Sequence, residues 1–147
     1  MGIELKGMAP LLQVYDMPTA IAFYCGTLGF ELVSHSPVVK SADGEYFHWV
    51  LLRYQGIELM LNTAYDEGQR PTARDLKRIA SHDDTCLYFG APDVDAVFDY
   101  LRGKGMDLQP PKIAPYGMKQ LYLHDPDGYN LCFQWAATKS ETSAARS

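Results

Sequence analysis

The feature that most restricts the fold is an order of predicted elements that occurs twice along the chain. A strand is followed by a helix and then by three strands, and the second half repeats that order. The repeat lies in hydrophobic pattern and turn residues rather than in residue identity. The elements are predicted over residues 10–16, 17–30, 30–37, 45–54 and 57–62, and then over 85–91, 93–105, 107–115, 118–125 and 129–135.

Turn and helix signals support these assignments. Pro18 suits the first turn of a helix, and Gly26 or Gly29 suits its end. Gln55 and Gly56 separate two apolar runs and predict a hairpin. The second helix has an apolar face. The closing turn contains a proline. The segment 107–115 also contains prolines, so we predict that it forms only a weak edge strand.

The repeat also predicts the domain organisation. Each half alone would leave one face of its sheet uncovered, so we expect the halves to pack on each other as one compact domain. A polar stretch between them reads as a linker or a flap over a site, with one or two helical turns near residues 72–80. The predicted parts are a first module (1–66), the linker or flap (67–82), a second module (83–136) and a flexible tail (137–147).

Composition narrows the function classes. The net charge of −5 argues against a nucleic-acid partner, which requires a basic face. Three cysteines without regular spacing do not form a disulfide framework. We find neither a signal peptide at the N-terminus nor an apolar run of roughly 20 residues, so we expect a soluble cytoplasmic protein without membrane partners.

Two stretches resemble the vicinal oxygen chelate superfamily, which includes glyoxalases, extradiol dioxygenases and bleomycin-resistance proteins. They are "IAFYCGTLGFELV" (21–33) and "YGMKQLYLHDPDGYNLCFQW" (116–135). The resemblance implies an α+β fold of paired βαβββ modules, with two curled mixed sheets and helices on their outer faces. It also implies a homodimer.

The same resemblance implies four positions for the ligands of a divalent metal, and these fall on Ala9, Glu58, Cys86 and Cys132. Only Glu58 is a ligand type of the family, although a slip of register would bring Gln13 to the first position. Catalytic divalent ions in such sites are held by hard or borderline ligands. We therefore expect no metal. The alternative is one ion, zinc, iron, manganese or nickel, on the atypical set Glu58, Cys86 and Cys132.

Side-chain alternation along the predicted strands indicates a cleft. The residues predicted to bind a ligand are Trp49, Glu58, Met60, Asn62, Tyr88, Tyr122, Cys132 and Gln134, with His124 on the same face. Aromatic surfaces with a few polar groups are typical of a small-molecule pocket. Each has a plainer explanation: Glu58 as a solvated remnant of the ligand set, His124 as a structural residue before a turn, and the aromatic residues as core or dimer interface. His35, His48 and His82 have no partner visible in the sequence.

Three functions remain open. The first is a metal-free homodimer that sequesters an aromatic or cationic small molecule, as bleomycin-resistance proteins do. The second is an enzyme, either a glyoxalase-like lyase, isomerase or dioxygenase with a metal, or a metal-free enzyme with Glu58 as base and Tyr122 or His124 as acid. The third is a structural or regulatory module, since a fold does not determine a function. The sequence favours the first.

Overall fold

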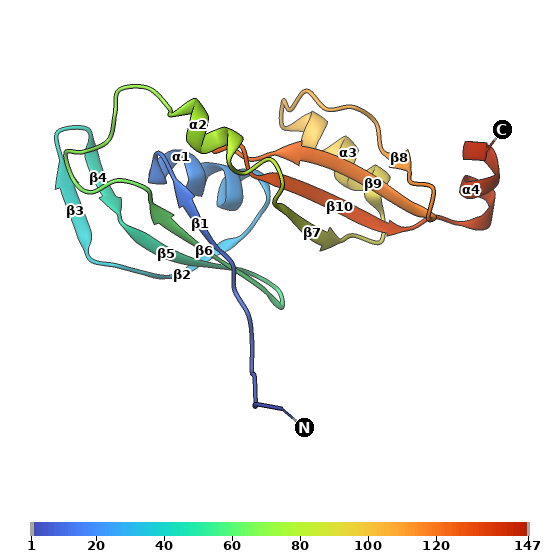
Figure 1. The fold of residues 1–147 in the computed structure, drawn as a ribbon, viewed down its shortest axis with the longest axis horizontal. Helices are drawn as coiled ribbons and strands as arrows, with labels where there is room; N and C mark the ends of the chain where they lie inside the picture. Colours follow the sequence, from blue (N-terminus) through green and yellow to red (C-terminus); the bar gives the residue numbers. More distant parts are fainter. Residues whose placement is uncertain (1, 147) are drawn as a thin grey trace. The chain divides into compact units, whose positions relative to one another are not determined.

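The computed structural model describes residues 2–146, which fall into two compact units. We call Met1–Arg74 the N-terminal unit and Asp75–Ser147 the C-terminal unit. Each unit contains a four-stranded mixed sheet with a helix packed on one face (Figure 1). The fold class is therefore α+β, as predicted.

The N-terminal unit is built on strands β1 (Leu11–Val14), β2 (Glu31–His35), β5 (Trp49–Tyr54) and β6 (Ile57–Thr63). Their order in the sheet is β1-β6-β5-β2; β1 and β6 are parallel and the other pairs antiparallel. Helix α1 (Met17–Ile21) continues as the π-helix η1 (Ala22–Thr27). The hairpin of β5 and β6 turns over two residues, with Tyr54 opposite Ile57, as predicted.

Local sequence explains where this helix begins and ends. Asp16 is the N-cap, and its carboxylate accepts a hydrogen bond from the Thr19 amide at 3.1 Å. Pro18 lies in the first turn. Gly29, two residues beyond η1, has a φ of +91°, which only glycine adopts without strain. The two helical segments therefore occupy most of the predicted range 17–30.

This unit also contains a second, two-stranded sheet, which the sequence did not predict as a separate sheet. It pairs β3 (Val38–Ser41) with β4 (Gly44–Phe47). The sequence predicted one continuous strand over 45–54, but the chain breaks at His48 between β4 and β5. The amides of His48 and Trp49 both donate to the Ser36 hydroxyl, at 3.1 and 3.0 Å, and this contact redirects the chain at the break.

The C-terminal unit contains α2 (Leu76–Ala80), β7 (Cys86–Gly90), α3 (Val94–Gly103), β8 (Lys112–Ile113), β9 (Met118–His124), β10 (Asn130–Ala136) and α4 (Lys139–Arg146). The strand order is β7-β10-β9-β8, with β7 and β10 parallel. Helix α3 packs on β9 and β10. Helix α2 lies within the range 72–80 where helical turns were predicted, and β8 is the short edge strand expected from its prolines.

Helix α4 differs from the prediction, because the sequence predicted a loose tail over 137–147. Thr138 and Glu141 form a reciprocal capping box: the Thr138 hydroxyl accepts from the Glu141 amide at 3.0 Å, and the Glu141 carboxylate accepts from the Thr138 amide at 2.9 Å. Glu141 also pairs with Lys119 Nζ at 2.5 Å, and this contact lowers the pKa of the Glu141 carboxyl to about 2. The pattern Thr-x-x-Glu at 138–141 was the signal that could have predicted this helix.

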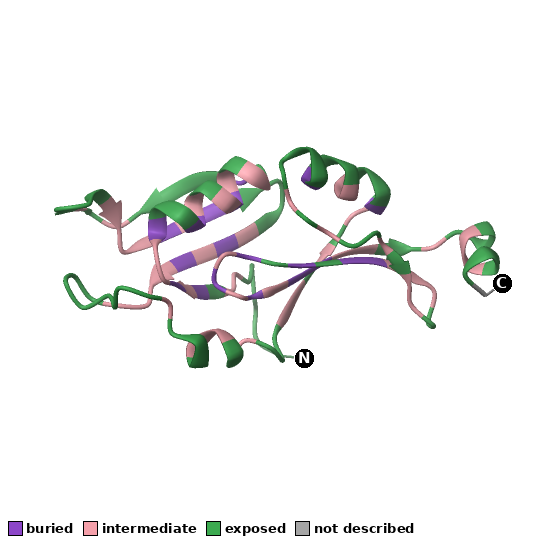
Figure 2. Ribbon diagram, turned by 90° about the horizontal axis from the view of Figure 1, so that it is seen from above, coloured by how far each residue is buried: buried purple, intermediate pink, exposed green. Residues whose placement is uncertain are grey.

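Alternation along the strands places the core of each unit between sheet and helix (Figure 2). In the N-terminal unit, Val50, Leu52, Leu59 and Leu61 are at most 2% exposed. In the C-terminal unit the corresponding buried residues are Leu121, Leu123 and Leu131 from the sheet and Val94 and Leu101 from α3. In the described part of the chain, no helix is long and apolar enough to cross a membrane.

Candidate functional site

The sheet of the N-terminal unit has a second face, opposite its buried leucines, which we call the N-terminal open face. It consists of Trp49, Leu51, Arg53, Glu58, Met60 and Asn62, which are paired across β5 and β6 as 49 with 62, 51 with 60 and 53 with 58. Strand β1 adds Leu11 and Gln13 beside Met60 and Asn62. The alternation predicted for these strands is therefore confirmed, and Trp49, Glu58, Met60 and Asn62 lie on one face. Their role in binding remains a prediction.

The charge on this face is internally paired. Arg53 Nη2 lies 2.9 Å from Glu58 Oε2, directly across the two strands. Both side chains remain partly exposed, at 47% and 34%. Asn62 is held by Gln13 Oε1 at 3.3 Å and by the Thr63 carbonyl at 3.2 Å. The Glu58 carboxylate thus has a guanidinium as its partner, a contact that sequence reasoning missed.

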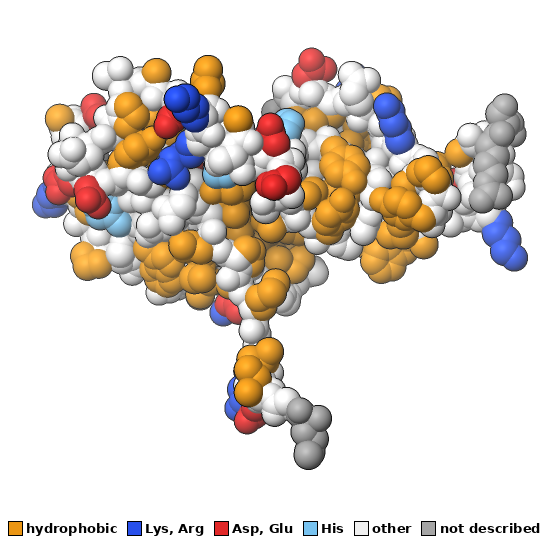
Figure 3. Space-filling view, in the orientation of Figure 1, with side chains coloured by type: hydrophobic (Ala, Val, Ile, Leu, Met, Phe, Trp, Pro, Cys, Tyr) orange, Lys and Arg blue, Asp and Glu red, His pale blue; other side chains and the backbone are white. Residues whose placement is uncertain are grey.

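The C-terminal unit has a corresponding face, which we call the C-terminal open face. Its members, named row by row, are Cys86, Asn130 and His124, then Tyr88, Cys132 and Tyr122, then Gln134 and Gln120. The prediction that Tyr122, His124, Cys132 and Gln134 share a face with Tyr88 is confirmed. Hydrophobic side chains, a class that includes tyrosine in Figure 3, gather over the β7, β10 and β9 part of this unit.

Two tyrosines dominate the middle row. The Tyr88 and Tyr122 hydroxyl oxygens lie 3.1 Å apart, and the rings meet edge to face with centroids 6.3 Å apart. Both side chains are about half exposed, whereas Cys132 on the strand between them is fully buried. Because the tyrosine pair spans the Cys132 thiol, the surface at this family metal position presents aromatic rings and hydroxyl groups instead of a thiol.

These contacts and burial determine the protonation of the hydroxyl and thiol groups on this face. The hydrogen bond between the Tyr122 and Tyr88 hydroxyls, together with burial, raises the pKa of the Tyr122 hydroxyl. Burial raises the pKa of the Cys132 thiol, and it also raises the pKa of the Cys86 thiol. At neutral pH the middle of this face therefore carries neutral hydroxyl and thiol groups.

Amide groups form the third row. Gln120 is 8% exposed, and its Nε2 donates to the Tyr116 hydroxyl and to Gln134 Oε1, both at 2.8 Å. Tyr116 was not among the predicted site residues, because it lies outside any strand and no sequence pattern aims it at the sheet. The hydrogen bond to Gln120 fixes Tyr116 at the rim of the face.

A hollow of about 790 Å³ adjoins this face within the same unit. It lies between strand β9 and the segment that joins α3 to β9, and its polar contributors include Gln120, Tyr122, His124 and Tyr116. Ligand pockets in proteins are typically about 300–1,000 Å³. The size and the mixed aromatic and amide lining suit a small organic molecule.

Three histidines and one asparagine make ring-stacking or hydrogen-bond contacts within the fold. His82 stacks on Tyr129 with ring centroids 3.8 Å apart, and His35 stacks on Phe47 at 4.1 Å. His48 Nδ1 lies 2.7 Å from the Thr63 hydroxyl oxygen. Asn130 Nδ2 lies within hydrogen-bond distance of three carbonyl oxygens, at 3.0 to 3.3 Å, in the segment 82–85. The partners of His35, His48 and His82 were invisible in the sequence because they depend on strand register and chain reversal.

The residues at the family's metal positions do not fit a divalent cation. Within either unit, the described residues contain no group of three or more His, Cys, Asp or Glu side chains that could hold a metal ion. The Arg53 guanidinium lies beside Glu58, where it neutralises the charge that would attract a cation. A cysteine binds metal as the thiolate, and burial raises the pKa of both candidate thiols.

Comparison with known proteins identifies the family. The chain is 27% identical to the uncharacterized protein YaeR of Escherichia coli (strain K12) over 119 residues, which cover 79% of this chain and 84% of that protein. Its fold is similar to that of TnmS3, an antibiotic binding protein from Streptomyces sp. CB03234, with a TM-score of 0.64 and 22% identity over 92% of this chain and 100% of that one. It is also similar to a bleomycin-binding protein complexed with bleomycin, with a TM-score of 0.63 and 18% identity over 88% and 98% of the two chains.

These two structural likenesses show a shared fold. A family model described as Glyoxalase/Bleomycin resistance protein/Dioxygenase superfamily matches residues 8–133, which is most of the chain. The chain therefore belongs to the glyoxalase/bleomycin resistance protein/dioxygenase superfamily.

Proposed function

We propose that the protein binds a small aromatic or cationic molecule on the C-terminal open face and in the hollow beside it, without a metal and without turnover. The observation that carries the proposal is the exposed Tyr88–Tyr122 pair next to a hollow of about 790 Å³. Half-exposed rings offer flat surfaces for stacking or for a cation. Gln120 and Gln134 supply directional amide groups at the edge of those rings.

Two related folds support a binding role. TnmS3 is described as an antibiotic binding protein, and another neighbour is a bleomycin-binding protein in complex with bleomycin. The absence of metal is supported by the chemistry at the family's ligand positions, where an arginine pairs with Glu58 and the thiols are held neutral. We infer that the ligand is sequestered, since the raised pKa values of Tyr122 and Cys132 leave the middle of this face with groups that keep their protons at neutral pH.

We further propose that the active form is a homodimer. The resemblance to the family supports this, and so does the sheet topology, because β1 is an edge strand of the N-terminal sheet and β7 is an edge strand of the C-terminal sheet. Edge strands present unpaired backbone groups that another chain can cover. Sedimentation velocity at several protein concentrations tests this, and a monomer at all of them contradicts it.

The binding proposal is tested with metal-free bleomycin and a panel of planar aromatic compounds, by isothermal titration calorimetry in the presence of EDTA. We expect at least one compound to bind, and each of Tyr88→Ala and Tyr122→Ala to weaken binding by about tenfold through loss of stacking. Tyr100→Ala on α3 is the matched control, because Tyr100 is similarly exposed at 48% but lies on the helix. Binding that needs a metal, or that all three variants weaken equally, contradicts the proposal.

The enzyme alternative makes a different prediction. A metal-free acid–base enzyme with Glu58 as base and Tyr122 or His124 as acid would turn over a substrate in the presence of EDTA. Its activity would fall in Glu58→Gln, while that variant would bind the panel compounds as the unmodified protein does. Product formation detected by mass spectrometry would favour the enzyme over sequestration.

A further inference from the structure

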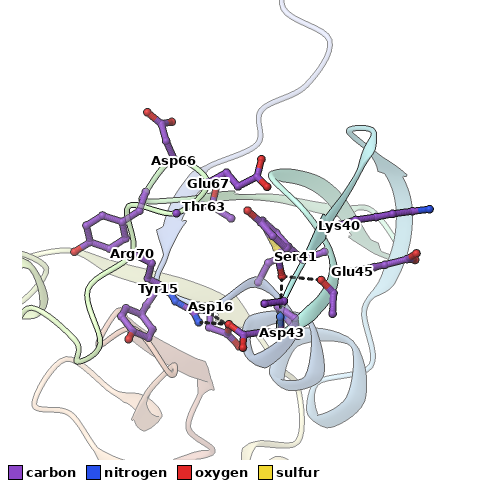
Figure 4. Close-up of a pocket in the computed structure, with 17 residues that line it drawn as sticks. Tyr15, Asp16, Lys40, Ser41, Asp43, Glu45, Thr63, Asp66, Glu67 and Arg70 are labelled. Atoms are coloured by element: carbon purple, nitrogen blue, oxygen red, sulfur yellow. Dashed lines mark hydrogen bonds and ion pairs between the residues drawn. The ribbon is translucent and has the colours of Figure 1, made fainter.

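The N-terminal unit contains a second cavity, of about 540 Å³, which is separate from its open face (Figure 4). It lies among the carboxyl end of β1, the hairpin of β3 and β4, and the segment that follows β6. Three tyrosines contribute to its lining: Tyr15, Tyr46 and Tyr65. Five carboxylates and two cationic side chains also line it, so the lining carries a net charge of −3 (2 − 5).

Of the two cationic side chains, Arg70 already pairs with carboxylates of the cavity lining. Arg70 Nη1 forms an ion pair with Asp16 Oδ1, and Arg70 Nη2 lies 3.8 Å from Asp43 Oδ2. The guanidinium carbon lies 5.0 Å from the centroid of the Tyr15 ring, within the range of a cation–π contact. Figure 4 shows Arg70 between Tyr15 and Asp16, whereas Lys40 and its cross-strand partner Glu45 extend away from them.

This arrangement shows which ligand chemistry the cavity walls accept. A planar cation is held by a ring face on one side and by carboxylates at its edge, which is a common way for proteins to bind guanidinium groups. The ring itself is fixed, because the Tyr15 hydroxyl donates to the Pro71 carbonyl at 2.6 Å. Asp16 is fixed as well, because it caps α1 through Thr19.

Arg70, by contrast, remains partly open to solvent. Its side chain is 39% exposed, and its second carboxylate contact, with Asp43, is long and involves a residue that is 86% exposed. Exposed ion pairs of this kind contribute little to stability. A soluble cation can therefore compete with Arg70 for Asp16 and for its place over the Tyr15 ring, which the Arg74 guanidinium also contacts at 4.8 Å from the centroid.

We propose that this cavity binds a small organic cation that carries a guanidinium or amine group, in the place that Arg70 now occupies. The cation would stack on Tyr15 and pair with Asp16 and Asp43. The rest of the ligand would extend towards Tyr46, whose hydroxyl has a raised pKa because of burial and the nearby Glu67 carboxylate. This site is independent of the C-terminal open face.

The test uses butylguanidinium as the probe and butylurea as its neutral isostere, titrated into the ¹⁵N-labelled protein and followed by NMR. We expect butylguanidinium to shift the amides of Tyr15, Asp43 and Glu67, and butylurea to shift none of them. A tethered side chain competes at an effective concentration on the order of millimolar. Arg70→Met should therefore bind butylguanidinium about tenfold more tightly than the unmodified protein.

Two further variants make the test decisive. Asp43→Asn, at the tip of an exposed hairpin, removes a carboxylate without touching the core and should weaken butylguanidinium binding several-fold in the Arg70→Met background. Lys77→Met on α2 removes a positive charge outside the cavity and should leave binding unchanged. Equal shifts from butylguanidinium and butylurea, or an Arg70→Met affinity no higher than that of the unmodified protein, would overturn the proposal.

Discussion

The two units have the same strand order, but their central hairpins differ in the turn and in the open face. The β5–β6 hairpin turns over Gln55 and Gly56, both exposed, and its face carries the Arg53–Glu58 ion pair. The β9–β10 hairpin turns over residues 125–129, where Asp125 and Asp127 are buried at 5% and 6% exposure. Its face carries neutral tyrosines above a buried thiol.

This difference shows how one topology supports two kinds of surface. An exposed hairpin tolerates a charged pair, because both ions keep part of their hydration. The fully buried Cys132 position requires a neutral group, because an isolated buried charge is costly. The buried Asp125 of the turn is not isolated in this way, because its carboxylate accepts hydrogen bonds from the amides of Asp127 and Tyr129. This contrast supports the proposal that a ligand stacks on the C-terminal open face, and the charged pair of the N-terminal open face has a smaller role in that proposal.

The largest effect on stability is expected when a glutamate, the acidic residue of the N-terminal open face, is placed on the C-terminal open face. Cys132→Glu introduces a carboxylate at a fully buried position whose cross-strand neighbour is Tyr122 instead of an arginine. We expect a loss of about 3 kcal/mol or more of unfolding free energy at pH 7, measured by urea denaturation. Burial raises the folded-state pKa of such a carboxyl, so the loss should grow as the pH rises above the unfolded pKa of about 4.3.

Cys132→Gln is the control for this experiment, since it has the same size and no charge. It should be less destabilising than Cys132→Glu at pH 7, and its effect should not depend on pH between 4 and 8. Equal stability of the two variants at pH 7 would mean that the position accepts a charge. The contrast between the two faces would then be wrong.

The turn of the β9–β10 hairpin provides the next prediction. Gly128 has a φ of +83°, and a Cβ there would lie 2.5 Å from Ile79 Cγ2. Gly128→Ala should cost about 2–3 kcal/mol, from the left-handed backbone and the overlap together. Gly105→Ala is the matched control, because Gly105 has a φ of +91° and nothing within 4 Å of its added Cβ.

The difference between Gly128→Ala and Gly105→Ala in urea denaturation therefore reports the overlap alone. Adding Ile79→Ala to Gly128→Ala should recover part of the loss. If the two glycine variants lose the same free energy, the close packing of α2 on this turn contributes nothing, and the buried turn would not distinguish the two hairpins.

Much of this comparison could be predicted from sequence, for identifiable reasons. Alternation and a two-residue turn at Gln55–Gly56 determine the register of β5 and β6, so Arg53 and Glu58 fall opposite each other. Asp125 and Gly128 predicted the closing turn, and register then aligns Tyr122 with Cys132. The fold class and the membership of each open face followed from these patterns.

Other features depend on contacts that a linear pattern does not contain. Tyr116 joins the site through a hydrogen bond to Gln120, and Arg70 reaches Asp16 from 54 residues away. The π-helical segment η1 cannot be distinguished from an α-helix by apolar spacing over six residues. Helix α4 was different, because its capping box at Thr138 and Glu141 is present in the sequence and was overlooked.

A smaller effect is expected from the tyrosine pair. The Tyr88 hydrogen bond raises the pKa of Tyr122 in the folded protein, so the folded state holds that proton more tightly than the unfolded state does. The stabilisation is fully present below the unfolded pKa of about 10 and is lost as the pH rises above it. Tyr88→Phe removes the bond, should lower the Tyr122 pKa and should cost about 1 kcal/mol at neutral pH.

The measurement is the ¹³Cζ chemical shift of Tyr122 during a pH titration, with Tyr100→Phe as control. In the unmodified protein Tyr122 should ionise at a higher pH than an ordinary tyrosine. In Tyr88→Phe the Tyr122 titration should move towards the ordinary value, while Tyr100→Phe should leave it in place. An unchanged Tyr122 titration in Tyr88→Phe would show that the hydroxyl pair does not form in solution.

The smallest effect is expected on the N-terminal face. Arg53→Met removes the partner of Glu58 from a pair whose side chains are 47% and 34% exposed. Because water solvates both ions, the unfolding free energy should change by less than about 1 kcal/mol, and 1 M NaCl should reduce the change further. Glu58→Gln should have a similarly small effect, and the double variant should show a coupling of a few tenths of a kcal/mol.

A coupling of 2 kcal/mol or more in urea denaturation would mean that the pair is desolvated in the assembled protein. The N-terminal face would then be covered rather than open, and the contrast with the tyrosine face would rest on assembly instead of on the turns.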